Sequence, residues 1–454
     1  MRVAVTGGSG QLGSVVLRRL IDHRKVKRIV SLDLSPPRLV SGKLEARQVD
    51  VRAPELAKHL EGCEVVFHLA FLVTAKVDPE VYYGVNVEGT RNVFQAAVQA
   101  GARQVIYASS MAAYGVYGDH PEPILETTPR RPLPDFPYSY AKYQVEDWLD
   151  QFEPTHPELA IVRLRPAILV GTRFGNPLGQ LFGQALERGW LVSSGDVPLP
   201  LVWDEDVADA AIAAMDQGRR GAYNLMATPE GGPAELAAAT GLKDVRTPKA
   251  LLALSSAAAP LLERLGLGDP VDPSWARFGG VRMVLSSEKA KQELSWRPRC
   301  PTNADVLRRY RAEAPGGGAR RLAWFFRSLD LASRGKTEPE LSGMSSAVHL
   351  ALLGPGGGDY TLRVEGGRLT TQAGAPRPPT SVATMKWEIF RQLLRGELDF
   401  ATAQLTGKLR LEGDTSAGFV VGALVRRFRN QTELPGWRGQ AARRFASWLA
   451  GGAA

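Results

Sequence analysis

Short apolar runs alternate with longer amphipathic stretches over the first 110 residues. The short runs are rich in β-branched residues, which predicts strands, and the longer stretches carry apolar residues at helical spacing. The predicted strands are Arg2–Thr6, Arg28–Asp33, Glu45–Val49, Val65–Leu69 and Gln104–Ser109, with helices over Leu12–His23 and Asn86–Ala100 and a further strand over Ile161–Leu169. Such alternation is typical of a parallel sheet covered on both faces, so we predict an α/β, doubly wound parallel-sheet domain.

The rest of the chain divides into a cap, a linker and a second domain. Residues 173–311 are rich in Pro and Gly, which predicts a small substrate cap, mainly within 173–300, that completes a first domain over 1–311. The glycine run 316–318 marks a flexible junction inside a linker over 312–340. A C-terminal α+β domain over 341–435 is predicted from a hairpin around Gly366-Gly367, a helix over Ser381–Leu394, a strand over Lys408–Glu412 and a helix over Ala417–Phe428.

The composition excludes several classes of protein. With 454 residues, of which 44% are hydrophobic, the chain is long enough for two or three domains that each have a core. The two cysteines, Cys63 and Cys300, are too few for a disulfide scaffold or a CxxC metal site, so we expect no metal. The first residues enter a strand pattern without a signal-peptide pattern, and no apolar run reaches the roughly 18 residues that a membrane span needs. We therefore expect a soluble, cytoplasmic protein.

Positive charge gathers towards the end of the chain. From Ala312 to Ala454 there are 19 Lys and Arg against 12 Asp and Glu, which accounts for most of the net charge of +9. Much of this charge lies in Arg426, Arg427, Arg429, Arg438, Arg443 and Arg444. One interpretation is a solvated basic tail over 436–454, and the other is peripheral contact with an anionic membrane or another acidic partner. No nucleic-acid motif accompanies the charge, so we expect no nucleic-acid partner.

A glycine-rich loop, Thr6-Gly-Gly-Ser-Gly-Gln-Leu-Gly13, follows the first predicted strand and opens a helix. Gly7, Gly10 and Gly13 allow a tight turn, a close backbone approach to a pyrophosphate, and close packing of the helix on the strand. The helix start, at Gln11 and Leu12, is expected to present amide groups to the phosphates. The loop therefore predicts a dinucleotide site.

The second predicted strand ends in an acidic residue, Asp33. A carboxylate at this position suits hydrogen bonds to the adenosine ribose hydroxyls and repels a 2′-phosphate, so it favours NAD. Arg38 nearby keeps NADP open as the less favoured cofactor.

Tyr138 and Lys142 lie four residues apart in Pro137-Tyr-Ser-Tyr-Ala-Lys142, one above the other on a predicted helix. A neighbouring ammonium favours the phenolate and lowers the tyrosine pKa, so Tyr138 is a candidate for moving a hydroxyl proton while hydride passes to or from a nicotinamide. Ser110 ends the fifth predicted strand at the carboxyl edge of the sheet, where its hydroxyl could bond the substrate oxygen. On its own the Tyr-x-x-x-Lys spacing is often just a helix surface, and the glycine loop favours the catalytic interpretation.

Together these motifs resemble an extended short-chain dehydrogenase/reductase of the NAD-dependent epimerase/dehydratase family over residues 1–311. Further matching segments are Phe67–Ala70, Asn86–Thr90, Ser109–Gly115, Leu164–Pro166, Val202–Ala208, Tyr223-Asn224, Ser287–Ala290 and Trp296–Pro298. The resemblance implies a Rossmann fold, a homodimer with paired helices, and a catalytic set made by Ser110, Tyr138 and Lys142. It also implies that Asp50 and Val51 border the adenine and that Leu69 and Ala70 line the cofactor path.

Two features of the sequence depart from the sugar-nucleotide members of this family. Trp203 stands where those members often have His, and the cap has no clear set of Arg and Asn residues that would hold a diphosphate. The cap instead offers the apolar run Ala250–Leu262 and Leu265, which is either core or a lid suited to a greasy substrate.

The C-terminal domain resembles an SCP2-like sterol-carrier domain, through Phe390–Asp399 and Gly407–Asp414. Such domains fold a sheet against helices around an apolar tunnel. The candidate tunnel residues, which could equally be core, are Trp387, Phe390, Leu394, Leu398, Phe400, Leu411 and Phe419.

The leading functional hypothesis is an NAD-dependent oxidoreductase that interconverts a secondary alcohol and a ketone on a hydrophobic, sterol-like or lipidic molecule, with a tethered lipid-binding domain. One alternative is a sugar-nucleotide epimerase or dehydratase, in which NAD is reduced and reoxidised within one cycle. The other is a non-catalytic lipid carrier that keeps NAD as a structural ligand, and the intact set of Ser110, Tyr138 and Lys142 speaks against it.

Overall fold

The computed structural model describes most of the chain. The described residues are 1–37, 39–73, 77–171, 186, 189–193, 196–229, 231–246, 275, 277–278, 280–313, 337–353, 358–373, 379–414 and 416–432. They form two compact units, one made of Met1–Pro37 with Lys43–Tyr310 and the other of Arg311–Ala454 with Arg38–Gly42. The apolar run 250–262 with Leu265, most of the expected linker, Arg38 and the basic tail lie outside the described residues.

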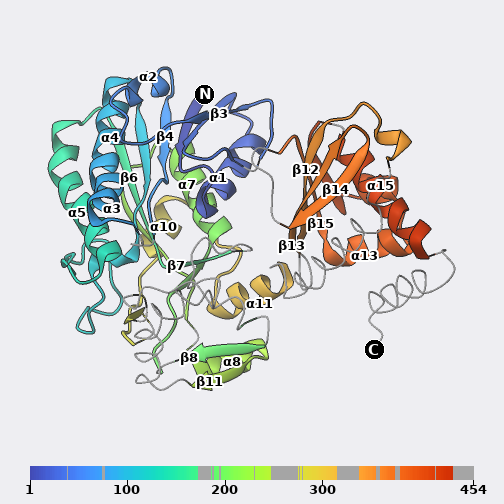
Figure 1. The fold of residues 1–454 in the computed structure, drawn as a ribbon. Coiled ribbons are helices and arrows are strands. Elements are labelled where there is room, and N and C mark those ends of the chain that lie inside the picture. Colours follow the sequence, from blue (N-terminus) through green and yellow to red (C-terminus); the bar gives the residue numbers. More distant parts are fainter. Residues whose placement is uncertain are drawn as a thin grey trace. The chain divides into compact units, whose positions relative to one another are not determined.

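The first unit is built on a parallel sheet of seven strands in the order β10-β6-β5-β4-β1-β2-β3 (Figure 1). The strands are β1 (Arg2–Thr6), β2 (Arg28–Asp33), β3 (Leu44–Gln48), β4 (Val65–His68), β5 (Gln104–Ala108), β6 (Ala160–Pro166) and β10 (Gly221–Leu225). The strand order reverses between β1 and β4, and a ligand crevice forms at the carboxyl ends of the strands at such a reversal. The doubly wound fold predicted from the sequence is confirmed.

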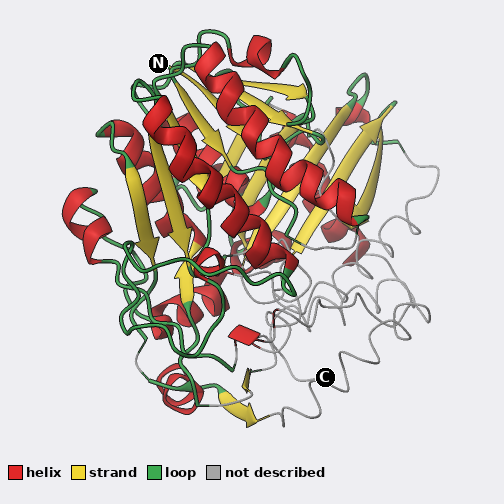
Figure 2. Ribbon diagram, turned by 90° about the vertical axis from the view of Figure 1, so that its left-hand side faces the viewer, coloured by secondary structure: helices red, strands yellow, loops and turns green. Residues whose placement is uncertain are grey.

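Helices cover both faces of this sheet (Figure 2). On one face α1 (Gln11–Asp22) packs against α7 (Asp204–Asp216). On the other face the helices share a buried apolar cluster with the sheet, to which α4 contributes Val93 and Phe94, and α5 contributes Val145 and Leu149. The helices of this face are α2 (Leu56–Leu60), α3 (Pro79–Tyr83), the π-helix η1 (Gly84–Glu88), α4 (Gly89–Gln99) and α5 (Pro137–Phe152).

The segment 173–311 is more than a cap, which corrects the expectation from its composition. Within it, α7 and β10 complete the doubly wound domain, and β10 pairs in parallel with β6. The sequence pattern hid β10 because the strand contains the polar Asn224, whose side chain is buried and hydrogen-bonded to Tyr114 Oη (2.8 Å) and to the Ile124 carbonyl (3.1 Å).

Smaller elements surround the carboxyl edge of the sheet. The predicted strand Ile161–Leu169 breaks at Ala167, and its second part pairs in a small separate sheet. These elements are η2 (Met111–Tyr114), η3 (Glu153–Thr155), β7 (Ile168–Val170), β8 (Trp190–Ser193), β9 (Leu201–Trp203), α8 (Pro233–Thr240), β11 (Lys243–Arg246), α10 (Glu288–Glu293) and α11 (Asn303–Glu313).

The second unit is a five-stranded mixed sheet with helices, in the order β14-β13-β12-β15-β16. The elements are η5 (Pro339–Leu341), β12 (Ser346–Leu353), β13 (Gly358–Glu365), β14 (Arg368–Ala373), β15 (Ser381–Lys386), α13 (Trp387–Arg395), α14 (Phe400–Leu405), β16 (Leu409–Gly413) and α15 (Ser416–Thr432). In this sheet β12 and β15 pair in parallel, and the other neighbouring strands pair antiparallel. The predicted α+β class and the hairpin at Gly366-Gly367 are confirmed.

The predicted helix over Ser381–Leu394 is wrong in its first half. Residues 381–386 form β15, whose Val382, Ala383 and Met385 are buried, and the helix begins only at Trp387. Both neighbours of β15 in the sheet, β12 and β16, supply ladder hydrogen bonds that override the helical spacing read from the sequence.

The candidate tunnel residues divide by their burial. Trp387, Phe390 and Leu394 belong to the buried apolar core, and Leu398, Phe400 and Leu411 pack against it partly buried. Phe419 is 57% exposed, so it does not line an enclosed interior. Among the described residues, no helix is long and apolar enough to cross a membrane.

Candidate active site

The glycine loop forms a bare backbone surface at the reversal of strand order. Gly7 follows β1 with a φ of +74°, and a Cβ on it would lie 2.5 Å from the Ala70 amide nitrogen. A Cβ on Gly13 would lie 2.0 Å from the Gly7 carbonyl oxygen, so side chains are excluded at both positions. Gly10 is the extended N-cap of α1 and makes no side-chain cap, and the helix then begins at Gln11. The first amides of a helix lack partners within the helix, so this loop fits a dinucleotide pyrophosphate.

Asp33, at the end of β2, lies directly beside this loop. Its carboxylate accepts hydrogen bonds from the Ser9 amide (3.0 Å) and the Ser9 hydroxyl (2.7 Å), and from the Ser35 amide (3.2 Å). This is the position expected for a residue that hydrogen-bonds the hydroxyls of the adenosine ribose.

The residues expected to border the adenine and the cofactor path follow the carboxyl ends of β3 and β4, which lie on either side of β1 and β2 in the sheet. Leu69 and Ala70 follow β4, with backbone atoms against Gly7. Val51 is buried and its carbonyl accepts a hydrogen bond from Asn92 (2.7 Å). Asp50 is paired with the guanidinium of Arg52 (2.7 Å), which lowers the pKa of the carboxyl. All four residues therefore lie at the carboxyl edge of the sheet, and Leu69 and Ala70 are the two that lie against the glycine loop.

Ser110 and Tyr138 meet at the same edge of the sheet. Ser110 follows β5 and caps η2, with its hydroxyl accepting a hydrogen bond from the Ala112 amide (3.1 Å). The Ser139 hydroxyl donates to the Ala112 carbonyl (2.6 Å), which ties the start of α5 to the same turn. The Ser110 hydroxyl lies close enough to the Tyr138 phenol to lower its pKa, so the two side chains lie together at this edge.

The expected lowering of the tyrosine pKa is not found. Burial raises the pKa of Tyr138 to about 12, and the hydrogen bond from Ser110 offsets only part of this effect. The Lys142 ammonium donates instead to the Ala108 carbonyl (2.6 Å) and to Tyr107 Oη (3.1 Å), and lies 5.9 Å from the centre of the Tyr138 ring. Burial also lowers the pKa of Lys142, with the charge of Glu146 acting in the opposite direction.

Glu146 is a site residue that the sequence analysis missed. It lies one helical turn beyond Lys142, is fully buried, and accepts a hydrogen bond from the Ser109 hydroxyl (2.5 Å). Arg165 binds both of its carboxylate oxygens (2.8 and 2.5 Å). Burial by itself would raise the pKa of Glu146, but the charge and hydrogen bonds of Arg165, with the charge of Arg163, lower it to about 2. The spacing 138-142-146 on one helix face was the signal that could have found it.

Asp204 is a second missed residue, at the start of α7. Its buried carboxyl accepts a hydrogen bond from Gln11 Nε2 (3.3 Å), so Asp204 contacts the first residue of α1, the helix that follows the glycine loop. A Cβ added to Gly171 would overlap this carboxyl, which shows how closely the chain encloses it. Burial raises the pKa of Asp204 to about 7, with the Gln11 hydrogen bond opposing the shift.

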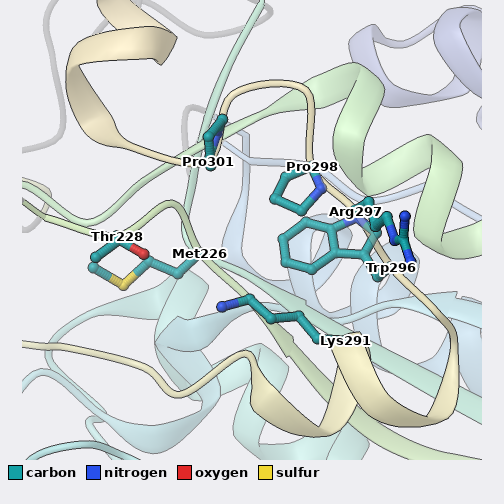
Figure 3. A pocket seen from close by; sticks show the side chains of 7 residues that line it. All are labelled: Met226, Thr228, Lys291, Trp296, Arg297, Pro298 and Pro301. Carbon is teal, nitrogen blue, oxygen red and sulfur yellow. The ribbon is translucent and has the colours of Figure 1, made fainter.

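A separate pocket of about 380 Å³ lies between β10 and α10. Figure 3 shows the Trp296 indole on one side of it, opposite Met226 and Thr228, with the Lys291 side chain below. Trp296 donates its indole N–H to the Asp206 carbonyl (2.8 Å) and Lys291 is paired with Glu288 (2.8 Å), so both polar groups already have protein partners. The pocket contains none of the residues of the candidate active site; it is lined by Met226, Thr228, Lys291, Trp296, Arg297, Pro298 and Pro301.

A bare glycine turn at the reversal of a parallel sheet, with an acidic residue ending the next strand, defines a dinucleotide-binding α/β domain. Residues 3–225 match the NAD dependent epimerase/dehydratase family, and residues 327–426 match the SCP-2 sterol transfer family. The chain therefore carries an NAD-dependent epimerase/dehydratase domain over residues 3–225 and an SCP-2 sterol transfer domain over residues 327–426. This confirms the resemblance found in the sequence and the choice of NAD as cofactor.

The relatives of the first unit have names that refer to different substrates. The UDP-glucose 4-epimerase of Mycolicibacterium smegmatis is 29% identical over 66% of this chain and 94% of that protein. The 3 beta-hydroxysteroid dehydrogenase type 7 of Rattus norvegicus is 40% identical over 24% of this chain and 36% of that protein. Among solved structures, the complex of the Thermus thermophilus UDP-glucose 4-epimerase with NAD is 25% identical, with a TM-score of 0.50, over 68% of this chain and 99% of that one.

Proposed function

We propose that the first unit interconverts a secondary alcohol and a ketone on a hydrophobic molecule, with NAD as the redox partner, and that the SCP-2 domain holds or delivers that molecule. The observation that carries the proposal is that Ser110, after β5, and the start of α5 with Tyr138 are tied to one turn at the sheet edge that also bears the glycine loop. The covalent link between the domains raises the local concentration of the lipid at the site.

The chain's own residues have distinct roles in this reaction. The Ser110 hydroxyl donates a hydrogen bond to the substrate oxygen, and Tyr138 gives a proton to that oxygen in reduction or removes it in oxidation. Bound NAD supplies the hydride acceptor, or the hydride donor in its reduced form. Glu146 holds the Ser109–Ser110 turn through the Ser109 hydroxyl, and the Lys142 amino group lies 5.9 Å from the centre of the Tyr138 ring.

The raised pKa of Tyr138 bears on the direction of the reaction. With a pKa of about 12, caused by burial, the phenol is protonated at neutral pH and ready to donate to a carbonyl oxygen. Oxidation of an alcohol needs the phenolate, which becomes more abundant as the pH rises. We therefore propose that the rate of alcohol oxidation increases with pH.

The second candidate function is sugar-nucleotide epimerisation, which is favoured by the long alignment with the mycobacterial epimerase. The fully buried Trp203 counts against it, because sugar-nucleotide members often have His at this place. Net accumulation of NADH separates the two functions, since an epimerase reoxidises its cofactor within each cycle.

The test uses the full chain, NAD and two probes, pregnenolone as a 3β-hydroxysteroid and UDP-glucose. Accumulation of NADH with pregnenolone supports the oxidoreductase, whereas conversion of UDP-glucose to its 4-epimer without NADH supports the alternative. Tyr138→Phe is expected to lower kcat by about 10²- to 10⁴-fold while NAD affinity stays nearly unchanged, because the phenol does proton chemistry. Wild-type turnover in this variant would refute the role of Tyr138.

A further inference from the structure

Four aromatic side chains from three segments gather around Tyr138. The Trp275 ring lies 5.0 Å from the Tyr138 ring between centroids, Phe71 lies 5.6 Å away edge-on, and Phe136 lies 6.2 Å away. Phe278 extends the group, at 5.9 Å from Trp275 and 6.0 Å from Phe136. The proton-transfer group is therefore enclosed in an aromatic cluster made by these four residues.

Each segment of the cluster is held in place by polar contacts away from the rings. Asn86 is buried and bonds the Leu72 amide (2.7 Å) and carbonyl (3.0 Å), which fixes the backbone next to Phe71. Arg277 forms an ion pair with Asp135, which joins the Trp275 segment to the residue preceding Phe136. These contacts set the positions of rings contributed by segments far apart in the sequence.

The cluster combines buried anchors with accessible faces. Phe136 and Phe278 are buried, whereas Phe71, Tyr138 and Trp275 are only partly so. The Lys142 amino group lies over the Phe71 ring, 3.4 Å from its centre, so Trp275 offers the less occupied aromatic surface. An aromatic face beside few polar groups suits a ligand with one oxygen and a large apolar body, because an aromatic face satisfies no hydroxyl group. A sugar ring with several hydroxyls would lose hydrogen bonds to water against the same surface.

We propose that Trp275 determines the substrate class of the dehydrogenase site, by packing the flat face of a fused-ring apolar molecule while its hydroxyl or keto oxygen reaches Ser110 and Tyr138. The proposal rests on the proposed oxidoreductase function and narrows its substrate from any lipid to a rigid, ring-fused one. A flexible open chain gains less from the tryptophan face because its bonds must be ordered on binding.

The kinetic test compares two secondary alcohols, pregnenolone and the open-chain 2-decanol, with NAD and the full chain. Trp275→Ala should raise KM for pregnenolone about tenfold or more and change kcat/KM for 2-decanol less than about threefold, with NAD affinity unchanged. Trp275→Phe should restore part of the loss. Trp190→Ala is the matched control, because Trp190 is a half-exposed tryptophan on β8 outside the aromatic cluster, and it should leave both alcohols unaffected. Equal losses for both alcohols, or none for pregnenolone, would overturn the proposal.

A second measurement separates this proposal from the proposed function. A photoreactive diazirine derivative of pregnenolone is crosslinked to the NAD-loaded chain, and the labelled peptides are mapped by mass spectrometry. Labelling at residues 71–72 or 275–278 that disappears in Trp275→Ala supports the aromatic site even if no alcohol is oxidised. Labelling confined to residues 341–432 would refute it, because the steroid would then bind only to the SCP-2 domain.

Discussion

The described interiors of the two units differ in the number of charged side chains that they bury. The first unit buries Lys142, Glu146, Arg165 and Asp204 close to its candidate site, each with hydrogen-bonded partners. Among its described residues the second unit buries fewer such groups, Arg427 and His349, beside an apolar cluster drawn from its sheet and its helices. Proton transfer needs charged groups held in fixed places, and a buried charge is tolerated only when it is paired. Binding an apolar ligand needs only apolar surface. The comparison predicts that the units fail in different ways when their interiors are changed.

The largest effect on stability is expected from Glu146→Gln. The change leaves Arg165 buried without its carboxylate partner, whereas Arg163 keeps Asp150 and Glu153, so the free energy of unfolding of the first unit should fall by about 3–5 kcal/mol. Urea unfolding, monitored through the loss of NAD binding, measures this free energy. Glu153→Gln, at a more exposed partner of Arg163, is the control and should cost less than about 1 kcal/mol. Similar losses in both variants would show that burial of the network is not what matters.

The matching change in the second unit is Phe390→Ala. Removing this fully buried ring should lower the free energy of unfolding of the second unit by about 3–5 kcal/mol through the cavity it leaves. Dehydrogenase turnover should persist, because the first unit has its own core. Phe419→Ala removes the same side chain from an exposed position of α15 and should change stability little. Loss of NAD binding in Phe390→Ala would contradict the independence of the units.

A smaller, pH-dependent effect is expected at Asp204. Burial raises its pKa to about 7, above the ordinary aspartate value, so the folded state holds a proton that the unfolded state has released. The free energy of unfolding should therefore fall as the pH rises from about 4 to 7, and Asp204→Asn should remove this slope. Asp209→Asn, on the same helix, should keep it. A slope unchanged in Asp204→Asn would assign the effect to another group.

The smallest effect is expected from Asp33→Ala, which removes a ribose-reading carboxylate without disturbing the core. NAD affinity should fall about tenfold and the preference for NAD over NADP should relax, since the negative charge that repels a 2′-phosphate is gone. Equilibrium binding of both cofactors checks this. If the preference does not move, another residue reads the ribose.

The sequence predicted the secondary structure correctly where a few neighbouring residues determine it. The strands β1 and β2 were predicted with their observed bounds, and the turn at Gly366-Gly367 was found because glycine permits its positive φ values. The prediction failed at β10 and β15, where the partner strands, distant in sequence, determine the conformation. Glu146 and Asp204 were missed for the same reason, because their partners Arg165 and Gln11 are remote along the chain.

The sequence by itself determined the family resemblance and the dinucleotide loop, because these depend on residue types at fixed short spacings. Only the tertiary structure decided how the phenol is surrounded. Burial among aromatic rings raises its pKa, and the lysine expected to lower that pKa donates its hydrogen bonds elsewhere. Solvation and electrostatics at a point depend on everything that packs around it, and strands and loops far apart in the chain supply most of those neighbours.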